Sequence, residues 1–231
     1  MREIVMDTET TGLDPADGHR IVEIGAVELM NHLPTGRVYH QYINPERAMP
    51  VEAFNVHGLG DEFLRDKPRF AQVVEAFLAF IGDDAQLVIH NASFDMRMIN
   101  AELEWANLPI LPMSRATDTL TIARQKFPGA QASLDALCRR FQIDNSVREK
   151  HGALLDSELL AEVYLELLGG RQQGLVLDAA RPGARNGETG ASGQARTRPR
   201  ALAPRLTDAE AEAHKAFVAE MDEPLWTRKI N

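Results

Sequence analysis

The stretch Ile4-Val5-Met6-Asp7-Thr8-Glu9-Thr10-Thr11-Gly12 joins an apolar run, typical of a buried strand, to two acids. Side chains alternate across a strand, so Asp7 and Glu9 point to the same side. Two such carboxylates repel each other, and the arrangement persists only if one is protonated or a cation lies between them. Hard divalent ions such as Mg²⁺ take oxygen ligands of this kind. The alternative is that both acids are solvated loop residues just past the strand.

Length and composition indicate one well-buried domain with an appendage, because the chain has 231 residues and 44% hydrophobic content. No apolar run approaches a membrane span, and Met1-Arg2-Glu3 leads into a strand rather than a signal peptide. Cys138 is the single cysteine, which excludes an internal disulfide, and its helical surroundings predict a packed core thiol. We therefore expect a cytoplasmic protein.

The order of predicted elements indicates a mixed α/β domain with helices on both faces of the sheet. Three early strands joined by short turns, at 14–18 and 31–36, favour an antiparallel meander. An irregular region with short helical pieces covers 50–64, and Ser93 is predicted to cap the helix that follows the fourth strand. The predicted strands are 3–7, 21–29, 38–43, 87–89 and 115–117, and the predicted helices are 68–81, 93–106, 118–127, 133–141 and 153–168.

The composition changes after this domain, which we place at residues 1–170. Residues 171–206 are predicted to be a flexible linker. Within it, residues 181–205 carry six arginines and one acid, a net charge of +5. Because the whole chain has a net charge of −9, the remaining residues carry −14. Residues 207–231 begin with a capping-box sequence and then a helix to about 221. Because this segment is too polar to form a domain, we expect it to fold against a partner; the alternative is a frayed tail.

Two further acids and a histidine need an explanation. Asp95 lies in the first turn of a predicted helix, where the helix dipole alone would favour it. Asp156 shares the apolar face of the last long helix, where a carboxylate costs several kcal/mol unless it is paired or metal-bound. His151 lies five residues earlier, beside Gly152, and is a candidate general base.

These residues lie in three motifs that resemble those of the DEDDh superfamily, 3′-to-5′ exonucleases with a ribonuclease H-like fold. The resemblance covers residues 3 to about 170 and is greatest to the proofreading subunits of bacterial replicative polymerases. It extends through Asn55-Val56-His57-Gly58 and Ser133-Leu134-Asp135-Ala136-Leu137-Cys138. The motifs are Asp7-Thr8-Glu9-Thr10-Thr11-Gly12, His90-Asn91-Ala92-Ser93-Phe94-Asp95 and His151-Gly152-Ala153-Leu154-Leu155-Asp156.

Phosphodiester hydrolysis needs an activated water, a neutralised phosphate and a stabilised leaving oxygen, which two divalent ions can supply. We expect Asp7 to bridge the ions, with Glu9 and Asp156 holding the ion that activates water. Asp95 would anchor the second ion, and His151 would take the proton from the attacking water, so that activity rises with pH as the imidazole loses its own proton. A carboxylate site predicts Mg²⁺ or Mn²⁺ rather than zinc.

The resemblance also implies contacts with the 3′ end of DNA. Thr10, His57, Asn91 and Phe94 are candidates for holding the terminal nucleotide, with the Phe94 ring offering a face for a base or sugar. A core position for Phe94 is the alternative. Asp118 follows a short strand and precedes a helix, so we interpret it as a helix cap rather than a catalytic acid.

The C-terminal part implies partners. Residues 172–177 resemble the short peptides that bind the sliding clamp, through Gln172, Leu175 and Leu177; the alternative is a plain linker with aliphatic residues. Residues 207–231 resemble the segment by which family members dock on the catalytic polymerase subunit, here through Phe217, Leu225 and Trp226. A small accessory subunit is a further expected partner.

The sequence thus predicts a metal-dependent 3′-to-5′ DNA exonuclease that proofreads for a replicative polymerase. One alternative is a free-standing exoribonuclease of the same superfamily that trims RNA 3′ ends, although such an enzyme has no evident use for a docking tail. A different class is a catalytically dead scaffold. The retained acids and His151 argue against a scaffold, because without metal the acids would cost stability.

Overall fold

A computed structural model of the chain describes residues 1–146, 148, 150–170 and 207–221. The chain divides into two compact units, 1–177 and 178–231. The first unit is built around a mixed five-stranded sheet in the order β3-β2-β1-β4-β5. β2 pairs antiparallel with β1 and β3, while β4 pairs parallel with β1 and β5. The strands are β1 (Arg2–Thr10), β2 (Ile21–Met30), β3 (Leu33–Tyr42), β4 (Gln86–Ile89) and β5 (Ala116–Asp118).

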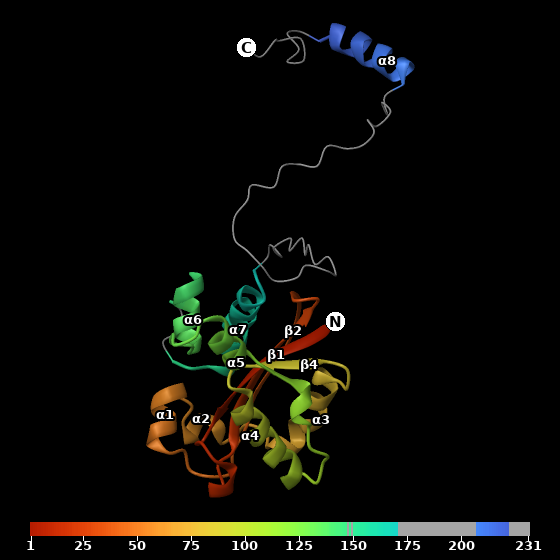
Figure 1. Cartoon of the computed structure of the whole chain (residues 1–231). Helices are drawn as coiled ribbons and strands as arrows, with labels where there is room; N and C mark the ends of the chain where they lie inside the picture. Colours follow the sequence, from red (N-terminus) through yellow and green to blue (C-terminus); the bar gives the residue numbers. More distant parts are fainter. Residues whose placement is uncertain (147, 149, 171–206, 222–231) are drawn as a thin grey trace, which may run out of the picture. The chain divides into compact units, whose positions relative to one another are not determined.

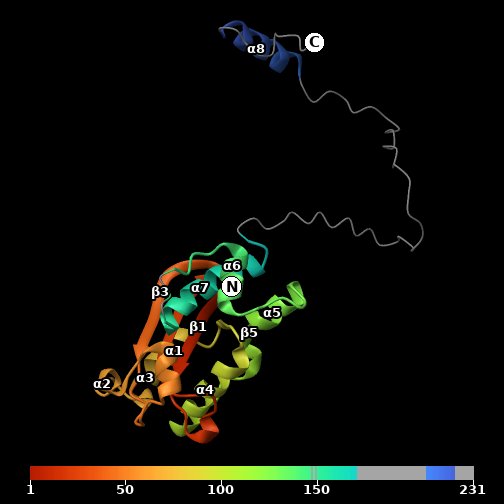
Figure 2. The same ribbon diagram turned by 90° about the vertical axis from the view of Figure 1, so that its left-hand side faces the viewer.

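Helices cover both faces of this sheet, as Figures 1 and 2 show. Ile4 and Met6 of β1 face the larger core, with α3 (Phe70–Ile81) and α4 (Ala92–Trp105). Val5 faces the opposite way, against α7 (Ala153–Leu167). α5 (Thr119–Lys126) and α6 (Leu134–Phe141) pack against α7 in a third cluster, which contains the buried thiol of Cys138 as predicted. The predicted α/β class, with a mixed sheet between helices, is confirmed.

The first strand is longer than predicted. β1 stays paired with β2 as far as Thr10, opposite Ile21, so Asp7 and Glu9 lie within the strand rather than at its end. The alternation of side chains therefore continues: Asp7 and Glu9 share the α7 face with Val5, and Thr8 faces the α4 side. This alternation decides which helix supplies a partner to each side chain.

The turn before β3 differs from the one that the sequence predicts. Asn31 and His32 both have positive φ, 52° and 66°, and form a two-residue hairpin, so β3 begins at Leu33 and not at residue 38. Pro34 and Gly36 suggested a long turn, but β3 is an edge strand of this sheet, where proline and glycine are tolerated.

Most helix ends agree with the prediction, with one correction. Asn91, in the left-handed conformation (φ 66°), is the N-cap of α4; Ser93 lies inside the helix and does not cap it. Gly82 ends α3 with φ 58°, and Ser133, predicted as the first residue of a helix, is the N-cap of α6. The region 50–64 forms two short helices, α1 (Val51–His57) and α2 (Asp61–Leu64).

The described part of the second unit is α8 (Asp208–Ala219). Thr207 and Glu210 form the predicted capping box, with the Glu210 carboxylate accepting from the Thr207 backbone N–H at 2.9 Å. Phe217 is exposed. Among the described residues, no helix is long and apolar enough to cross a membrane.

Candidate active site

Three elements bring the four predicted acids to one end of the sheet. Asp7 and Glu9 come from the α7 face of β1, Asp156 from the first turn of α7, and Asp95 from the first turn of α4. Their charges act on one another: Asp95, Glu9 and Asp156 each raise the pKa of Asp7. The sequence-predicted acids therefore form one cluster.

Thr8 positions Asp95 from the other face of β1. The Asp95 carboxylate, which is buried, accepts from the Thr8 backbone N–H at 3.1 Å and from the Thr8 hydroxyl at 2.7 Å. Because Thr8 lies between Asp7 and Glu9 in the strand, this pair of bonds ties α4 to the acidic segment of β1. The role of Thr8 was missed in the sequence, where it is simply the residue between two acids.

His151 joins the cluster from the loop before α7. Ligand atoms of Glu9, His151 and Asp156 all lie within 4.8 Å of one another, as in a site able to hold a metal ion. The His151 Nδ1 atom is 3.3 Å from Asp156 Oδ2, and the His151 backbone N–H donates to the Val56 carbonyl at 3.2 Å. The loop is thus held against α1 while its imidazole reaches the acids.

The electrostatics of the cluster differ sharply between its acids. Burial, reinforced by the neighbouring acids, raises the pKa of Glu9 to about 8 and that of Asp7 well above its usual value. Burial raises the pKa of Asp95 to about 7 despite the bonds from Thr8. Burial acts to raise the pKa of Asp156, but its contacts with His151 and Arg148 outweigh burial and lower this pKa. Without a cation, Asp7, Glu9 and Asp95 therefore keep their protons to a higher pH than free carboxyls do, whereas Asp156 ionises readily.

These pKa values predict how stability depends on pH. A carboxyl whose pKa is raised on folding binds more protons in the folded chain, so its contribution to stability is lost as pH rises through the folded value. With a chelator present, we expect the melting temperature to fall by about 5 °C or more between pH 5 and pH 9, given roughly 2–4 °C per kcal/mol in a domain of this size. The fall should level off as pH passes the folded-state pKa values of about 7 for Asp95 and about 8 for Glu9. Excess Mn²⁺ should remove it, and a melting temperature independent of pH in chelator would contradict the prediction.

Arg148 is a site residue that sequence reasoning missed. Its guanidinium, with a side chain only 7% exposed, donates from Nε to Asp156 Oδ1 at 2.5 Å and from an NH2 nitrogen to Asp156 Oδ2 at 2.6 Å. It also donates to Asp135 Oδ1 of α6 at 2.6 Å and lies 2.8 Å from His151 Nδ1. Its partners lie 3 to 13 residues away in the sequence, and Arg148 itself lies in a loop, so no helical or strand periodicity indicates which residues it contacts.

Glu23 is a second residue that the sequence did not single out. It lies opposite Glu9 in the β1–β2 register and is buried. One of its oxygens accepts from the Ala153 backbone N–H at 3.2 Å, and the other lies 2.7 Å from His40 Nε2. Glu23 thus fixes the N-terminus of α7, and an acid inside the apolar run 21–29 was the available signal.

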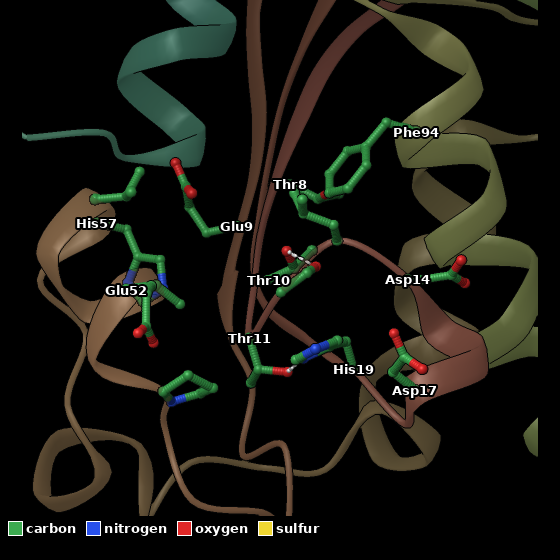
Figure 3. A pocket seen from close by; sticks show the side chains of 15 residues that line it. Thr8, Glu9, Thr10, Thr11, Asp14, Asp17, His19, Glu52, His57 and Phe94 are labelled. Atoms are coloured by element: carbon green, nitrogen blue, oxygen red, sulfur yellow. Dashed lines mark hydrogen bonds between the residues drawn. The ribbon is translucent and has the colours of Figure 1, made fainter.

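A cavity of about 580 Å³ is lined by Glu9 of the acid cluster and by three of the four predicted nucleotide contacts, Thr10, His57 and Phe94. Figure 3 shows Glu9 and His57 on one side of it, and the Phe94 ring, from α4, on the other. Asn91 is not among the lining residues and serves as the α4 N-cap. Phe94 both lines the cavity and packs against the larger core, so its two interpretations are compatible.

His57 is buried beneath this cavity. Its Nδ1 atom accepts from the Leu59 backbone N–H at 3.0 Å, which leaves Nε2 as the protonated nitrogen of a neutral ring. Burial lowers the pKa of His57 more than the nearby Thr10 backbone raises it. Among the described residues, Nε2 makes no hydrogen bond of standard geometry. His57 is therefore held as a neutral ring with its proton on the buried Nε2 atom.

Asp118 is confirmed as a helix cap. Its carboxylate accepts from the Leu120 backbone N–H at 3.0 Å, and also from the Thr121 hydroxyl at 2.8 Å and the Asn91 backbone N–H at 3.0 Å. These bonds lower the pKa of Asp118 although burial acts to raise it. All of its bonds are structural, so Asp118 joins α5 to the start of α4.

The predicted partner residues lie largely beyond the described part of the chain. Gln172, Leu175, Leu177, Leu225 and Trp226 are outside the described residues. Phe217 is described, on the exposed surface of α8. Partner binding through these residues remains a prediction.

With the fold and the acids in place, comparison with known proteins defines the class. A family model described as an exonuclease matches residues 4–164, and the chain belongs to this exonuclease family. The solved nuclease domain of 3′hExo, a DEDDh member bound to rAMP, is similar over 72% of this chain and 91% of its own, with a TM-score of 0.63 at 20% identity. Exonuclease X in complex with 5′ overhanging duplex DNA is 26% identical, with a TM-score of 0.55 over 72% of this chain and 90% of its own.

Curated relatives narrow the class further. The DNA polymerase III subunit epsilon of Rickettsia felis is 57% identical over 74% of this chain and 76% of its own length. The epsilon subunit of Rickettsia typhi is 48% identical over 94% of this chain and 96% of its own length. The epsilon subunit of Escherichia coli K12 is 50% identical over 74% of this chain and 72% of its own length. The chain is thus a 3′-to-5′ exonuclease homologous to the epsilon subunits, which confirms the predicted class of enzyme.

Proposed function

We propose that this chain is the proofreading subunit of a replicative DNA polymerase and hydrolyses DNA from the 3′ end, releasing nucleoside monophosphates. The observation that supports this function is the convergence of Asp7, Glu9, Asp95 and Asp156 with His151 beside a cavity of nucleotide size. The identity of 48–57% to epsilon subunits supports the choice of DNA and of a polymerase partner.

The donor set fits two divalent ions, Mg²⁺ or Mn²⁺. Buried carboxylates with raised pKa values are stabilised by hard cations, and all the acids offer oxygen ligands. Asp7 would help to hold both ions, Glu9 and Asp156 would hold one of them, and Asp95 would hold the other. When bound, the ions would neutralise the phosphate and favour ionisation of the attacking water.

The chain's own residues would do the rest. His151 lies beside Glu9 and Asp156, on a loop held at the Val56 carbonyl, and would accept the proton of the attacking water. His57 and Phe94, which line the cavity, would hold the terminal nucleotide, with the Phe94 ring against its base or sugar. Thr8 would orient Asp95 through its two hydrogen bonds, which also oppose the effect of burial on the pKa of Asp95.

The test is degradation of a mispaired DNA primer–template and of an RNA of the same length, each with and without Mg²⁺. We expect metal-dependent shortening of the DNA from its 3′ end, faster than that of the RNA. Preference for RNA would instead support the free-standing exoribonuclease. Absence of metal-dependent shortening of either would support the scaffold.

Docking on the polymerase is tested by truncation. Removing residues 207–231 should abolish co-elution with the catalytic polymerase subunit, because α8 exposes Phe217 and is separated from the nuclease domain by the predicted linker. The rate on free single-stranded DNA should stay within about twofold, since every proposed catalytic residue precedes residue 170. Size-exclusion chromatography of the mixed proteins checks the first expectation. Unchanged co-elution of the truncated chain would refute it.

A further inference from the structure

Arg148 contacts Asp156, Asp135 and His151, and the proposed hydrolysis gives it no role. Both oxygens of Asp156 accept from its guanidinium, at 2.5 and 2.6 Å, in a two-pronged ion pair. Such charge-assisted pairs are among the strongest hydrogen bonds in proteins. The guanidinium therefore holds a carboxylate that the proposed function assigns to a divalent ion.

The same guanidinium also forms a hydrogen bond with His151, the proposed general base. The NH2 nitrogen that bonds Asp156 lies 2.8 Å from His151 Nδ1. Because a guanidinium only donates, Nδ1 must accept, and the lone pair of a neutral imidazole is then used up. In this arrangement His151 has no free lone pair with which to take a proton from water. Arg148 thus engages one proposed ligand and the proposed base at once.

A guanidinium and a divalent ion on one carboxylate repel each other, because both are positive and little water separates them. Arg148 has another anion available: Asp135 of α6 accepts from Arg148 Nη1 at 2.6 Å and is half exposed. The Asp135 side chain is itself held by Asn145 Nδ2 at 3.1 Å. A side chain that gave up Asp156 and His151 would therefore keep one ion pair.

We propose that Arg148 is an internal competitor of the divalent ions, which holds Asp156 and His151 until an ion takes Asp156 and the guanidinium retreats onto Asp135. The inference rests on the proposed function, since it needs ions at Asp156. It makes Arg148 a positioning residue that sets how much free metal the enzyme needs. Exchange of the guanidinium for an ion then releases the base and completes the site in one movement.

The test is a titration of the full-length protein with Mn²⁺ at pH 8, in which the electron paramagnetic resonance signal of the free ion measures how much Mn²⁺ is bound. Arg148→Gln should bind Mn²⁺ roughly ten- to hundredfold more tightly, the range expected when one charge-assisted hydrogen-bonded pair no longer competes. Asp135→Asn should bind more weakly, because the guanidinium loses its alternative partner. Arg139→Gln, which removes the same charge from an exposed position of α6, is the matched control and should bind as the wild type does.

The opposite signs expected for Arg148→Gln and Asp135→Asn separate this inference from a structural role. If Arg148 only supported the fold, both variants would weaken binding and both would lower the melting temperature in Mn²⁺. Arg148→Gln that is folded by circular dichroism but binds Mn²⁺ no more tightly than the wild type would overturn the inference. A wild-type chain that binds no Mn²⁺ would instead overturn the proposed metal site.

Discussion

Asp7→Asn is expected to lower exonuclease activity by at least the ~10²–10³-fold that follows removal of one electrostatic stabiliser from an active site. Asp7 lies on the α7 face of β1, where the charges of Asp95, Glu9 and Asp156 all act on it. In the proposed site it serves both ions, so its loss affects the attacking and the leaving side of the reaction. Asparagine has the same shape, and the strand should keep its register.

The variant should also be more stable than the wild type in chelator. Burial and like charges oppose ionisation of Asp7, so a neutral side chain of equal size relieves repulsion that the folded chain otherwise carries. Activity on a mispaired primer and melting temperature in chelator should therefore change in opposite directions. A variant that is inactive because it is misfolded would lose both.

Asp118→Asn is the matched control. It makes the same chemical change at an acid whose hydrogen bonds are structural, and asparagine is an equally good helix N-cap. We expect activity within about threefold of the wild type, which is less than 1 kcal/mol. Equal losses in the Asp7 and Asp118 variants would contradict the assignment of both residues.

Three of the four acids could be predicted from the sequence because each violates a local pattern, whereas Asp95 was indicated only by its motif. Asp7 and Glu9 interrupt an apolar strand, and Asp156 lies on the apolar stripe of a helix. Burial costs such residues free energy, which makes them visible without a structure. Glu23 violates its strand in the same way and would have been found by the same rule applied to the second strand.

Other features could not be predicted, because their causes lie in pairings distant in sequence. Arg148 bonds Asp135 and Asp156, on two different helices, and nothing in its own surroundings distinguishes it from a solvated arginine. The hairpin at Asn31 was missed because Pro34 and Gly36 are strong turn residues, and only the edge position of β3 makes them acceptable in a strand. The extension of β1 through Glu9 likewise depends on its pairing with β2.

Gly25→Ala is the second change expected to have a large effect. Gly25 lies opposite Asp7 in the β1–β2 register, on the face that α7 covers. A Cβ atom there would lie 2.2 Å from both the Ala153 carbonyl carbon and the Leu154 nitrogen. These are backbone atoms in the first turn of α7, so no side-chain rotation relieves the contact.

The strain must move α7 away from β2. Ser157 of α7 donates to the Gly25 carbonyl at 2.9 Å, and this buried bond would lengthen with the movement. We expect a loss of about 1–3 kcal/mol in the free energy of unfolding, typical of overpacking in a core. The free energy of unfolding is measured by urea titration, with circular dichroism reporting the folded fraction. Gly152→Ala, where nothing lies within 4 Å of the added Cβ, is the matched control and should cost much less.

Activity should fall further than stability alone explains. Asp156 is carried by the first turn of α7, so displacement of that turn separates it from Glu9 and Asp7 on β1. A misplacement of about 1 Å in a catalytic group can cost about 10²-fold in rate. We therefore expect Gly25→Ala, at a temperature where it remains folded, to lose about 10²-fold in exonuclease rate and to bind Mn²⁺ more weakly. Gly25 lies opposite Asp7 in the β1–β2 register, so the geometry of the acids should depend on the close approach of α7 to β2 at this point. If the folded variant bound Mn²⁺ as tightly as the wild type does, this dependence would be refuted.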